Sequence, residues 1–193
     1  MLTVILTGGA SRRMGRDKAM LKIGDKTMLQ HIIDKYSSLG EVAVSVNQHG
    51  RFPVEGALEL VDRFPDKGPL NGLVSAFSET DFDTIFLTGT DLPLGEPALV
   101  NKLIELSEGY DACVMQRGVK GIEPLFAIYN RSCSEKAYDC LDEGRRSFMA
   151  LFDRVNVRYV EENELRDFDL DRILLNVNTT EEFEKIEKFF NKA

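Results

Sequence analysis

Hydrophobic and polar positions along this chain alternate between two patterns. Short apolar runs rich in Val, Ile, Leu and Phe are typical of buried strands, and they recur between stretches whose apolar residues repeat at helical spacing. The apolar runs predict strands over residues 3–6, 42–46, 57–61, 84–87, 112–115, 125–129 and 155–160. The periodic stretches predict helices over residues 27–39, 69–79, 97–108, 132–143 and 181–190.

This alternation of strands and helices predicts an α/β fold around a mainly parallel sheet. Ligands of such sheets bind beyond the carboxyl ends of the strands. In this sequence the first four predicted strands are followed by glycine or polar residues, which are Thr7-Gly8-Gly9, Asn47, Asp62 and Asp91. These positions therefore form the predicted rim of a binding site.

The length and composition favour a single domain over residues 1–193. The chain is 43% hydrophobic and contains 12 Phe, which is enough to bury a core. Its first ten residues are typical of a strand rather than a signal peptide, so we expect a cytoplasmic protein. Cys113, Cys133 and Cys140 are odd in number and lack metal-ligand spacing, which predicts free thiols.

The charge of the chain excludes some partners and favours others. With 24 basic and 32 acidic residues the net charge is −8, so we expect neither nucleic acid nor a membrane surface as a partner. Residues 11–22 are an exception, because they carry five basic side chains and a single acidic one. This local positive cluster favours a small anionic ligand, although a solvated charged surface is the alternative.

The loop after the first predicted strand, residues 6–18, has the composition of a phosphate-binding segment. It lacks the Gly-Lys-Ser/Thr of a Walker A loop and the spacing of GxGxxG. Its glycines, Gly8 and Gly9 among them, allow a tight turn in which successive N–H groups point at one anion. Arg13 and Lys18 can add charge-assisted hydrogen bonds to phosphate oxygens.

The same loop, LTGGASRRMGRDK, closely resembles the LAGGxSxRMGxDK signature of the molybdenum cofactor guanylyltransferase family. Further similar segments are GPLNG at residues 68–72, GTDLP at 89–93, GRRSF at 144–148 and NVNTTEE at 176–182. The resemblance spans nearly the whole chain. It implies a three-layer α/β/α Rossmann-like nucleotidyltransferase fold. The nucleotide-binding part would cover about residues 1–95, and the acceptor-binding part about residues 96–193.

The resemblance also implies Mg²⁺-dependent transfer of GMP from GTP to molybdenum-molybdopterin, with release of pyrophosphate. The catalytic residues that it implies are Arg13, Lys18 and Asp91. The nucleotide-binding residues that it implies are Leu6, Thr7, Gly8, Gly9, Lys18, Asn47, Asp62, Gly68, Gly72 and Asp91. The candidate ligands of Mg²⁺ are Asp91 and Asn178, and the candidate acceptor contacts are Arg145, Arg146 and Asn176.

Some of these residues also suit a purely structural role. A carboxylate such as Asp91 is a hard oxygen ligand for Mg²⁺, but an Asp before Leu-Pro also forms turns. Asn178 precedes a predicted helix and suits a helix cap equally well. Asn71 stands where the family usually has alanine, close to the expected position of the base.

Two other functions remain open at this point. The first is a related transferase with another base or acceptor, such as a molybdopterin cytidylyltransferase or a sugar- or alcohol-phosphate nucleotidyltransferase. The second is a non-catalytic nucleotide-binding adaptor. The joint presence of Arg13, Lys18 and Asp91 favours an enzyme over an adaptor. Transient contacts with cofactor-biosynthesis or acceptor proteins are also expected.

Overall fold

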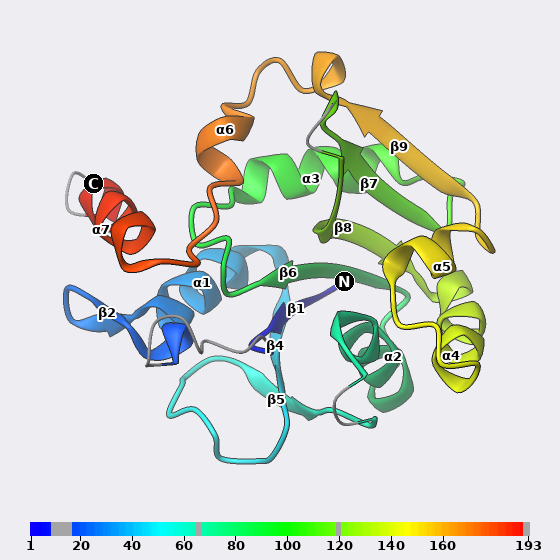
Figure 1. The fold of residues 1–193 in the computed structure, drawn as a ribbon, viewed down its shortest axis with the longest axis horizontal. Coiled ribbons are helices and arrows are strands. Elements are labelled where there is room, and N and C mark those ends of the chain that lie inside the picture. Colours follow the sequence, from blue (N-terminus) through cyan, green and yellow to red (C-terminus); the bar gives the residue numbers. More distant parts are fainter. Residues whose placement is uncertain (9–16, 65–66, 119–120, 191–193) are drawn as a thin grey trace.

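A single large sheet forms the centre of the molecule (Figure 1). The computed structural model describes residues 1–8, 17–64, 67–118 and 121–190. In this part of the chain, seven strands pair in the order β5-β4-β1-β6-β8-β7-β9. Their bounds are β1 Leu2–Leu6, β4 Glu41–Val46, β5 Leu58–Val61, β6 Thr84–Gly89, β7 Ala112–Gln116, β8 Ile122–Asn130 and β9 Val157–Glu161. Two short strands, β2 Lys22–Ile23 and β3 Lys26–Thr27, form a separate hairpin.

The sheet is mainly parallel, as predicted. Strand β1 runs parallel to β4 and β6, β5 runs parallel to β4, and β9 runs parallel to β7. Strand β8 is antiparallel to both of its neighbours, β6 and β7. The connection from β7 to β8 covers only residues 117–121, which is too short for the crossover that a parallel pair requires.

Helices cover both faces of the sheet and make a three-layer α/β/α arrangement. The helices are α1 Met28–Tyr36, α2 Pro69–Glu79, α3 Pro97–Leu106, α4 Ser134–Asp142, α5 Phe148–Phe152, α6 Leu170–Ile173 and α7 Thr180–Phe190. Buried residues of α1, α3, α6 and α7 share one hydrophobic core, and those of α2, α4 and α5 share the other (Figure 1). Strand β1 contributes Ile5 to the first core and Val4 and Leu6 to the second, because successive side chains point to opposite faces.

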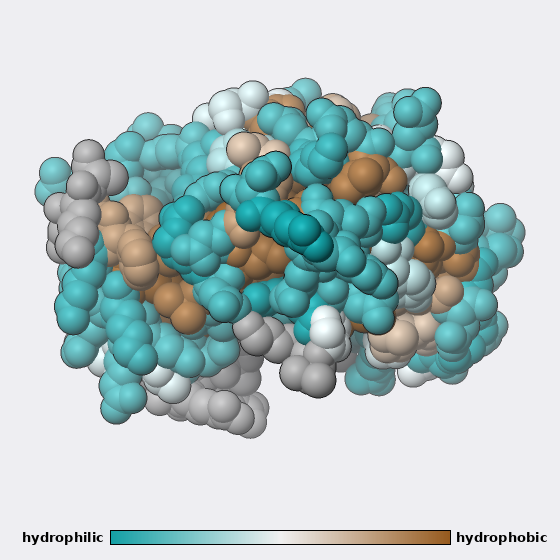
Figure 2. All heavy atoms as spheres, turned by 90° about the horizontal axis from the view of Figure 1, so that it is seen from above, coloured by the Kyte–Doolittle hydropathy of each residue, from teal (hydrophilic) through white to brown (hydrophobic). Residues whose placement is uncertain are grey.

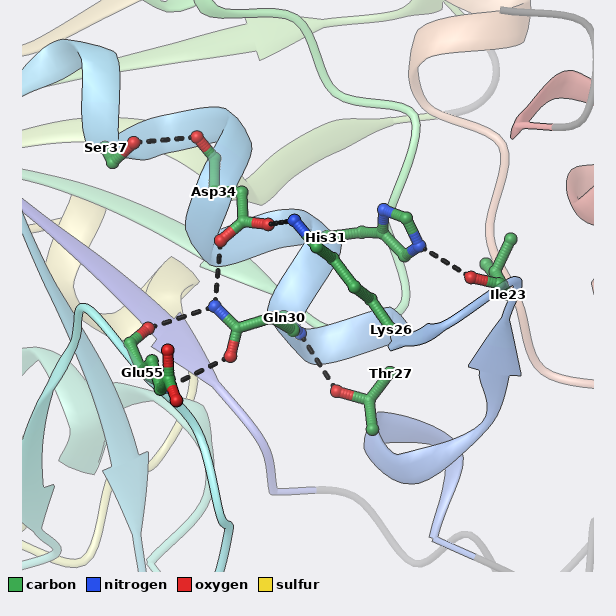
Figure 3. A network of polar contacts seen from close by, with 8 residues as sticks. All are labelled: Ile23, Lys26, Thr27, Gln30, His31, Asp34, Ser37 and Glu55. Carbon is green, nitrogen blue, oxygen red and sulfur yellow. Dashed lines mark hydrogen bonds and ion pairs between the residues drawn. The ribbon is translucent and has the colours of Figure 1, made fainter.

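Helix α1 begins as its sequence predicts and is tied to two neighbouring segments. The Thr27 hydroxyl accepts a hydrogen bond from the Gln30 N–H at 3.1 Å, which makes Thr27 the predicted N-cap. The Gln30 side chain donates to the Glu55 carbonyl at 3.0 Å (Figure 3). His31 Nε2 lies 2.8 Å from the Ile23 carbonyl (Figure 3). The hairpin and the loop before β5 are thereby fixed to α1, and His31 has a structural role.

The surface of the described residues is largely hydrophilic. In the view of Figure 2, hydrophobic residues reach the surface in patches that hydrophilic residues separate. The large apolar side chains that are exposed, Leu58, Tyr138, Met149 and Phe189, belong to four different elements. Within the described ranges no helix has the length and apolar character to cross a bilayer. The three cysteines are buried free thiols, as predicted.

Gly95, in the loop between β6 and α3, makes room for two buried aromatic rings. A Cβ at this position would overlap the Tyr36 hydroxyl and would lie 2.6 Å from Phe126 Cε2. Both rings are 0% exposed and are held by close packing. We therefore expect Gly95→Ala to lower the free energy of unfolding by about 2 kcal/mol, measured by urea denaturation.

A second substitution tests the cause of that loss. The Tyr36 hydroxyl is buried and has no hydrogen-bond partner among the described residues, so Tyr36→Phe should change stability little on its own. In the Tyr36→Phe background, Gly95→Ala should cost less, because one of the two overlaps is gone. An equal cost in both backgrounds would contradict the packing explanation.

Candidate functional site

A cavity of about 700 Å³ lies at the carboxyl ends of β1, β4, β5 and β6. It is lined by the predicted residues Leu6, Thr7, Gly8, Lys18, Asn47, Asp62, Gly68, Gly72 and Asp91. The other lining residues are Ser45, Arg51, Lys67, Pro69, Asn71, Gly89, Thr90 and Leu125. Two further predicted residues, Gly9 and Arg13, lie outside the described residues.

Backbone pairing brings these segments to one edge of the sheet. Leu6 is in register with Ser45 on β4 and with Gly89 on β6. The ladder continues just past the strand ends, where the Thr90 N–H donates to the Leu6 carbonyl at 3.1 Å and the Asp62 N–H donates to Val46 at 2.8 Å. The positions of the cavity residues therefore follow from the main chain of the sheet.

One end of the cavity carries two opposite charges. Lys18 Nζ lies 3.8 Å from Asp91 Oδ2 and 3.5 Å from the Val177 carbonyl. The side chains of Lys18 and Asp91 are 14% and 25% exposed, so both remain accessible from the cavity. Gly89 makes room for this arrangement, because a Cβ there would overlap the Asp91 carboxylate. A cation and a carboxylate so placed can bind phosphate oxygens and a metal ion, respectively.

Lys18 is held by the turn that it begins. Residues Lys18–Met20 form a 3-10 helix whose N-cap is Asp17, and the Asp17 carboxylate accepts from the Ala19 N–H at 3.2 Å. The other oxygen of Asp17 accepts from Arg51 at 3.0 Å. Arg51 also donates to the Asn47 side chain at 3.2 Å. The loops after β1 and β4 are thus joined beside the cavity by one guanidinium group.

The opposite side of the cavity contains a chain of hydrogen bonds that ends at Asp62. The Thr7 hydroxyl donates to the Ser45 carbonyl at 2.6 Å, and the Ser45 hydroxyl donates to Asp62 Oδ1 at 2.6 Å. Burial raises the pKa of Asp62, while the Ser45 hydrogen bond and the charge of Arg51 act in the opposite direction. A partly buried carboxylate of this kind can accept hydrogen bonds from ligand hydroxyl groups.

Each glycine of the cavity is required, or tolerated, for a different structural reason. Gly68 caps α2 with φ of +79°, a conformation that favours glycine. At Gly72 a Cβ would overlap the Leu6 side chain, so this glycine allows α2 to pack closely on β1. A Cβ at Gly8 would meet no described atom within 4 Å, which leaves its backbone open to the cavity.

The predicted residues of the C-terminal half, Arg145, Arg146, Asn176 and Asn178, do not line the cavity. The backbone of Arg146 approaches Gly68, with its carbonyl oxygen 3.8 Å from the position of a Cβ there. Arg145 forms an exposed ion pair with Asp153 at 3.2 Å. The Asn176 side chain lies 3.5 Å from the Leu174 carbonyl.

Asn178 lies next to the segment that supports Asp91. The Val177 N–H donates to the Asp91 carbonyl at 2.9 Å. The cap of α7 is formed mainly by Thr179, whose hydroxyl accepts from the Glu182 N–H at 3.2 Å. Asn178 contributes its backbone N–H, which donates to the Glu182 carboxylate at 2.7 Å.

Sequence reasoning missed several residues of the cavity, notably Ser45, Arg51 and Lys67. Ser45 carried a usable signal, because it is a polar residue near the carboxyl end of a strand that is apolar at positions 42–44 and 46. Arg51 and Lys67 lie in loops. In a loop, the spacing of residues along the sequence does not indicate which way a side chain points.

Fold and cavity together define a three-layer α/β protein with a ligand site at the carboxyl ends of its parallel strands. Residues 3–159 match the MobA-like NTP transferase domain. The chain is 30% identical to a probable molybdenum cofactor guanylyltransferase of Methanosarcina mazei, over 95% of this chain and 88% of that protein. It is 32% identical to one of Pelotomaculum thermopropionicum, over 94% and 89% of the two chains.

A solved structure has the same fold. The molybdopterin-guanine dinucleotide biosynthesis protein A of Archaeoglobus fulgidus superposes with a TM-score of 0.85 and 24% identity, over 100% of both chains. The chain belongs to the MobA-like NTP transferase family and is a nucleotidyltransferase.

Lys35 supports the Asp91 loop from outside the cavity. Its ammonium donates to the Pro93 carbonyl at 2.5 Å and lies 5.6 Å from the centre of the Phe190 ring. Burial lowers the pKa of Lys35 from its ordinary value of 10.5 to about 8, Glu96 acts against this shift, and Arg172 adds to it.

This shift predicts a dependence of stability on pH. Between pH 8 and 10.5 the unfolded chain binds the Lys35 proton and the folded chain does not, so stability rises with pH. From pH 7.5 to 9.5 the wild type should gain on the order of 1–2 kcal/mol relative to Lys35→Met, measured by urea unfolding. Lys102→Met, at a partly exposed position on α3, is the control. A constant difference between wild type and Lys35→Met would contradict the burial of this charge.

Proposed function

We propose that this chain transfers GMP from GTP to molybdenum-molybdopterin and releases pyrophosphate. The observation that carries the proposal is the arrangement of charged and polar groups in this cavity, with Lys18 and Asp91 at one end and Asp62 with Ser45 at the other. The charged end suits phosphates and the other end suits a nucleoside. The names of the relatives in Methanosarcina mazei and Pelotomaculum thermopropionicum support guanine and the molybdenum cofactor.

In this proposal the first half of the chain, about residues 1–95, seats the nucleotide. The nucleoside would be held by residues Leu6 to Gly9, by Asn47 and Asp62, and by the segment from Gly68 to Gly72. Of these, Leu6, Thr7, Gly8, Asn47, Asp62, Gly68 and Gly72 line the cavity. Lys18 and Arg13 hold the triphosphate. Phosphoryl transfer requires little covalent chemistry from a protein, so positioning and neutralisation of charge carry most of the catalysis.

The second half of the chain, about residues 96–193, presents the acceptor, with Arg145, Arg146 and Asn176 as its contacts. The approach of the Arg146 backbone to Gly68 supports this placement, because it brings the second half to the edge of the nucleotide cavity. A phosphate oxygen of the acceptor forms a bond to the α-phosphorus of GTP, and the bond to the leaving pyrophosphate breaks. The attacking phosphate is already ionised, so no general base is required.

Asp91 would hold the Mg²⁺ of the reaction, with Asn178 as a second ligand. The Asp91 carboxylate fits such an ion, because it is a hard oxygen donor at the phosphate end of the cavity, and Mg²⁺ takes its remaining ligands from phosphates and water. When bound, the ion would neutralise charge on the triphosphate and on pyrophosphate. We place the reaction in the cytoplasm, with transient contacts to proteins that make or receive the cofactor.

Asp91→Asn tests the metal assignment. The amide keeps the size of the side chain but is a weaker ligand, so metal-dependent turnover should fall at least 100-fold while the melting temperature changes little. Pyrophosphate release against Mg²⁺ concentration is the measurement. Asp83→Asn, at an exposed residue outside the cavity, should keep full turnover. Unchanged turnover of Asp91→Asn would reject the assignment.

Lys18→Ala tests the phosphate end of the cavity. Loss of one charge-assisted contact should weaken GTP binding roughly tenfold or more and should affect GMP much less, because GMP lacks the β- and γ-phosphates. Titration calorimetry with both nucleotides measures the difference. Lys22→Ala, an exposed lysine of β2, is the matched control. Equal losses for GTP and GMP would count against this role.

The function itself is tested by incubating the protein with Mg²⁺, molybdopterin and each of the four NTPs in turn. Pyrophosphate release with GTP alone, and a guanine nucleotide in the product, is the expected result. Release with CTP would indicate a cytidylyltransferase. Nucleotide binding without any release of pyrophosphate would indicate an adaptor.

A further inference from the structure

Asn71 is a buried polar residue in the first turn of α2 that lines the nucleotide cavity. Its exposed fraction is 1%, and its backbone N–H donates to the Gly68 carbonyl at 3.1 Å. Gly72, the next residue, packs on Leu6 and fixes the position of the turn.

The orientation of the Asn71 amide is determined by its neighbours. The Phe64 N–H lies 3.0 Å from Asn71 Oδ1, and a backbone N–H can only donate. The Ser75 hydroxyl lies 3.4 Å from the same oxygen and accepts from the Arg63 N–H at 2.9 Å. The oxygen of the amide therefore faces residues 63–64, and its NH₂ group faces elsewhere.

The NH₂ group opens onto the cavity. It donates to no acceptor among the described residues, and it is not fully enclosed by them, unlike the hydroxyl of Tyr36. Because Asn71 lines the cavity, the direction that remains for Nδ2 is the cavity itself. A donor held in this way is oriented before any ligand arrives.

Asn71 also lies at the end of the cavity that is far from the phosphates. It contacts the segment that follows β5, whereas Asp91 follows β6, and β4 and β1 lie between these strands. At about 4.8 Å between neighbouring strands, the ends of β5 and β6 lie roughly 14 Å apart. With the phosphates at Lys18, the base would lie beside Asn71.

We propose that Asn71 selects the base by donating a hydrogen bond from Nδ2 to O6 of guanine. The inference rests on the proposed function. A donor at this position favours a base with a carbonyl group there, and it disfavours adenine and cytosine, which present an amino group. The oxygen of the same amide accepts the hydrogen bonds that hold residues 63–64. One side chain would therefore both position this loop and contact the base.

The test uses Asn71→Asp with GTP and with 2-aminopurine riboside triphosphate, which lacks O6. The aspartate keeps an oxygen for Phe64 and Ser75 and replaces the NH₂ group with an acceptor. Its added charge repels both nucleotides alike, so the ratio of the two affinity losses isolates the contact with O6. We expect the substitution to weaken GTP about tenfold more than the analogue, measured by calorimetry.

Ser75→Ala is the matched control. It loosens the support of Oδ1 and of residues 63–64 without changing Nδ2, so it should weaken both nucleotides equally. Equal losses for GTP and the analogue in Asn71→Asp would overturn the inference while the proposed function stands. A wild type that binds neither nucleotide would overturn both.

Discussion

Parallel pairing of β1 with both β4 and β6 is the constraint on which the cavity depends. In this register Leu6 lies beside Ser45 on one neighbour and Gly89 on the other, so segments far apart in sequence leave the sheet at one edge. A slip of one residue would turn each side chain to the opposite face and exchange the two hydrophobic cores. The loops that carry Asp62 and Asp91 therefore take their positions from the sheet.

The charged end of the cavity joins the two ends of the chain. Lys18 comes from the loop after the first strand, Asp91 from the loop after β6, and Val177 from the segment before the last helix. Lys18 forms an ion pair with Asp91 and donates a hydrogen bond to the Val177 carbonyl, and the Val177 N–H donates to the Asp91 carbonyl. Partial burial strengthens the interaction of Lys18 with an anion relative to a fully solvated lysine. The segment before α7 thus matters for the site, although none of its described residues lines the cavity.

Much of the fold was predictable because its longer elements have clear periodicity. Helix α2 has the predicted bounds, and Thr27 caps α1 as expected. The two-residue strands of the hairpin and the four-residue helix α6 are too short to show a period, and the direction of β8 follows from a tight connection. At the site, residues that follow strands were predictable. Arg51, in a loop, and the orientation of the Asn71 amide depend on tertiary neighbours that spacing does not reveal.

A crystal structure of the protein with GTP and Mg²⁺ tests the central claim most directly. The triphosphate should lie against Lys18, the metal should contact the Asp91 carboxylate, and the nucleoside should extend toward Asp62. A nucleotide bound at another surface, with Asp91 directed away from it, would contradict the assignment of this cavity.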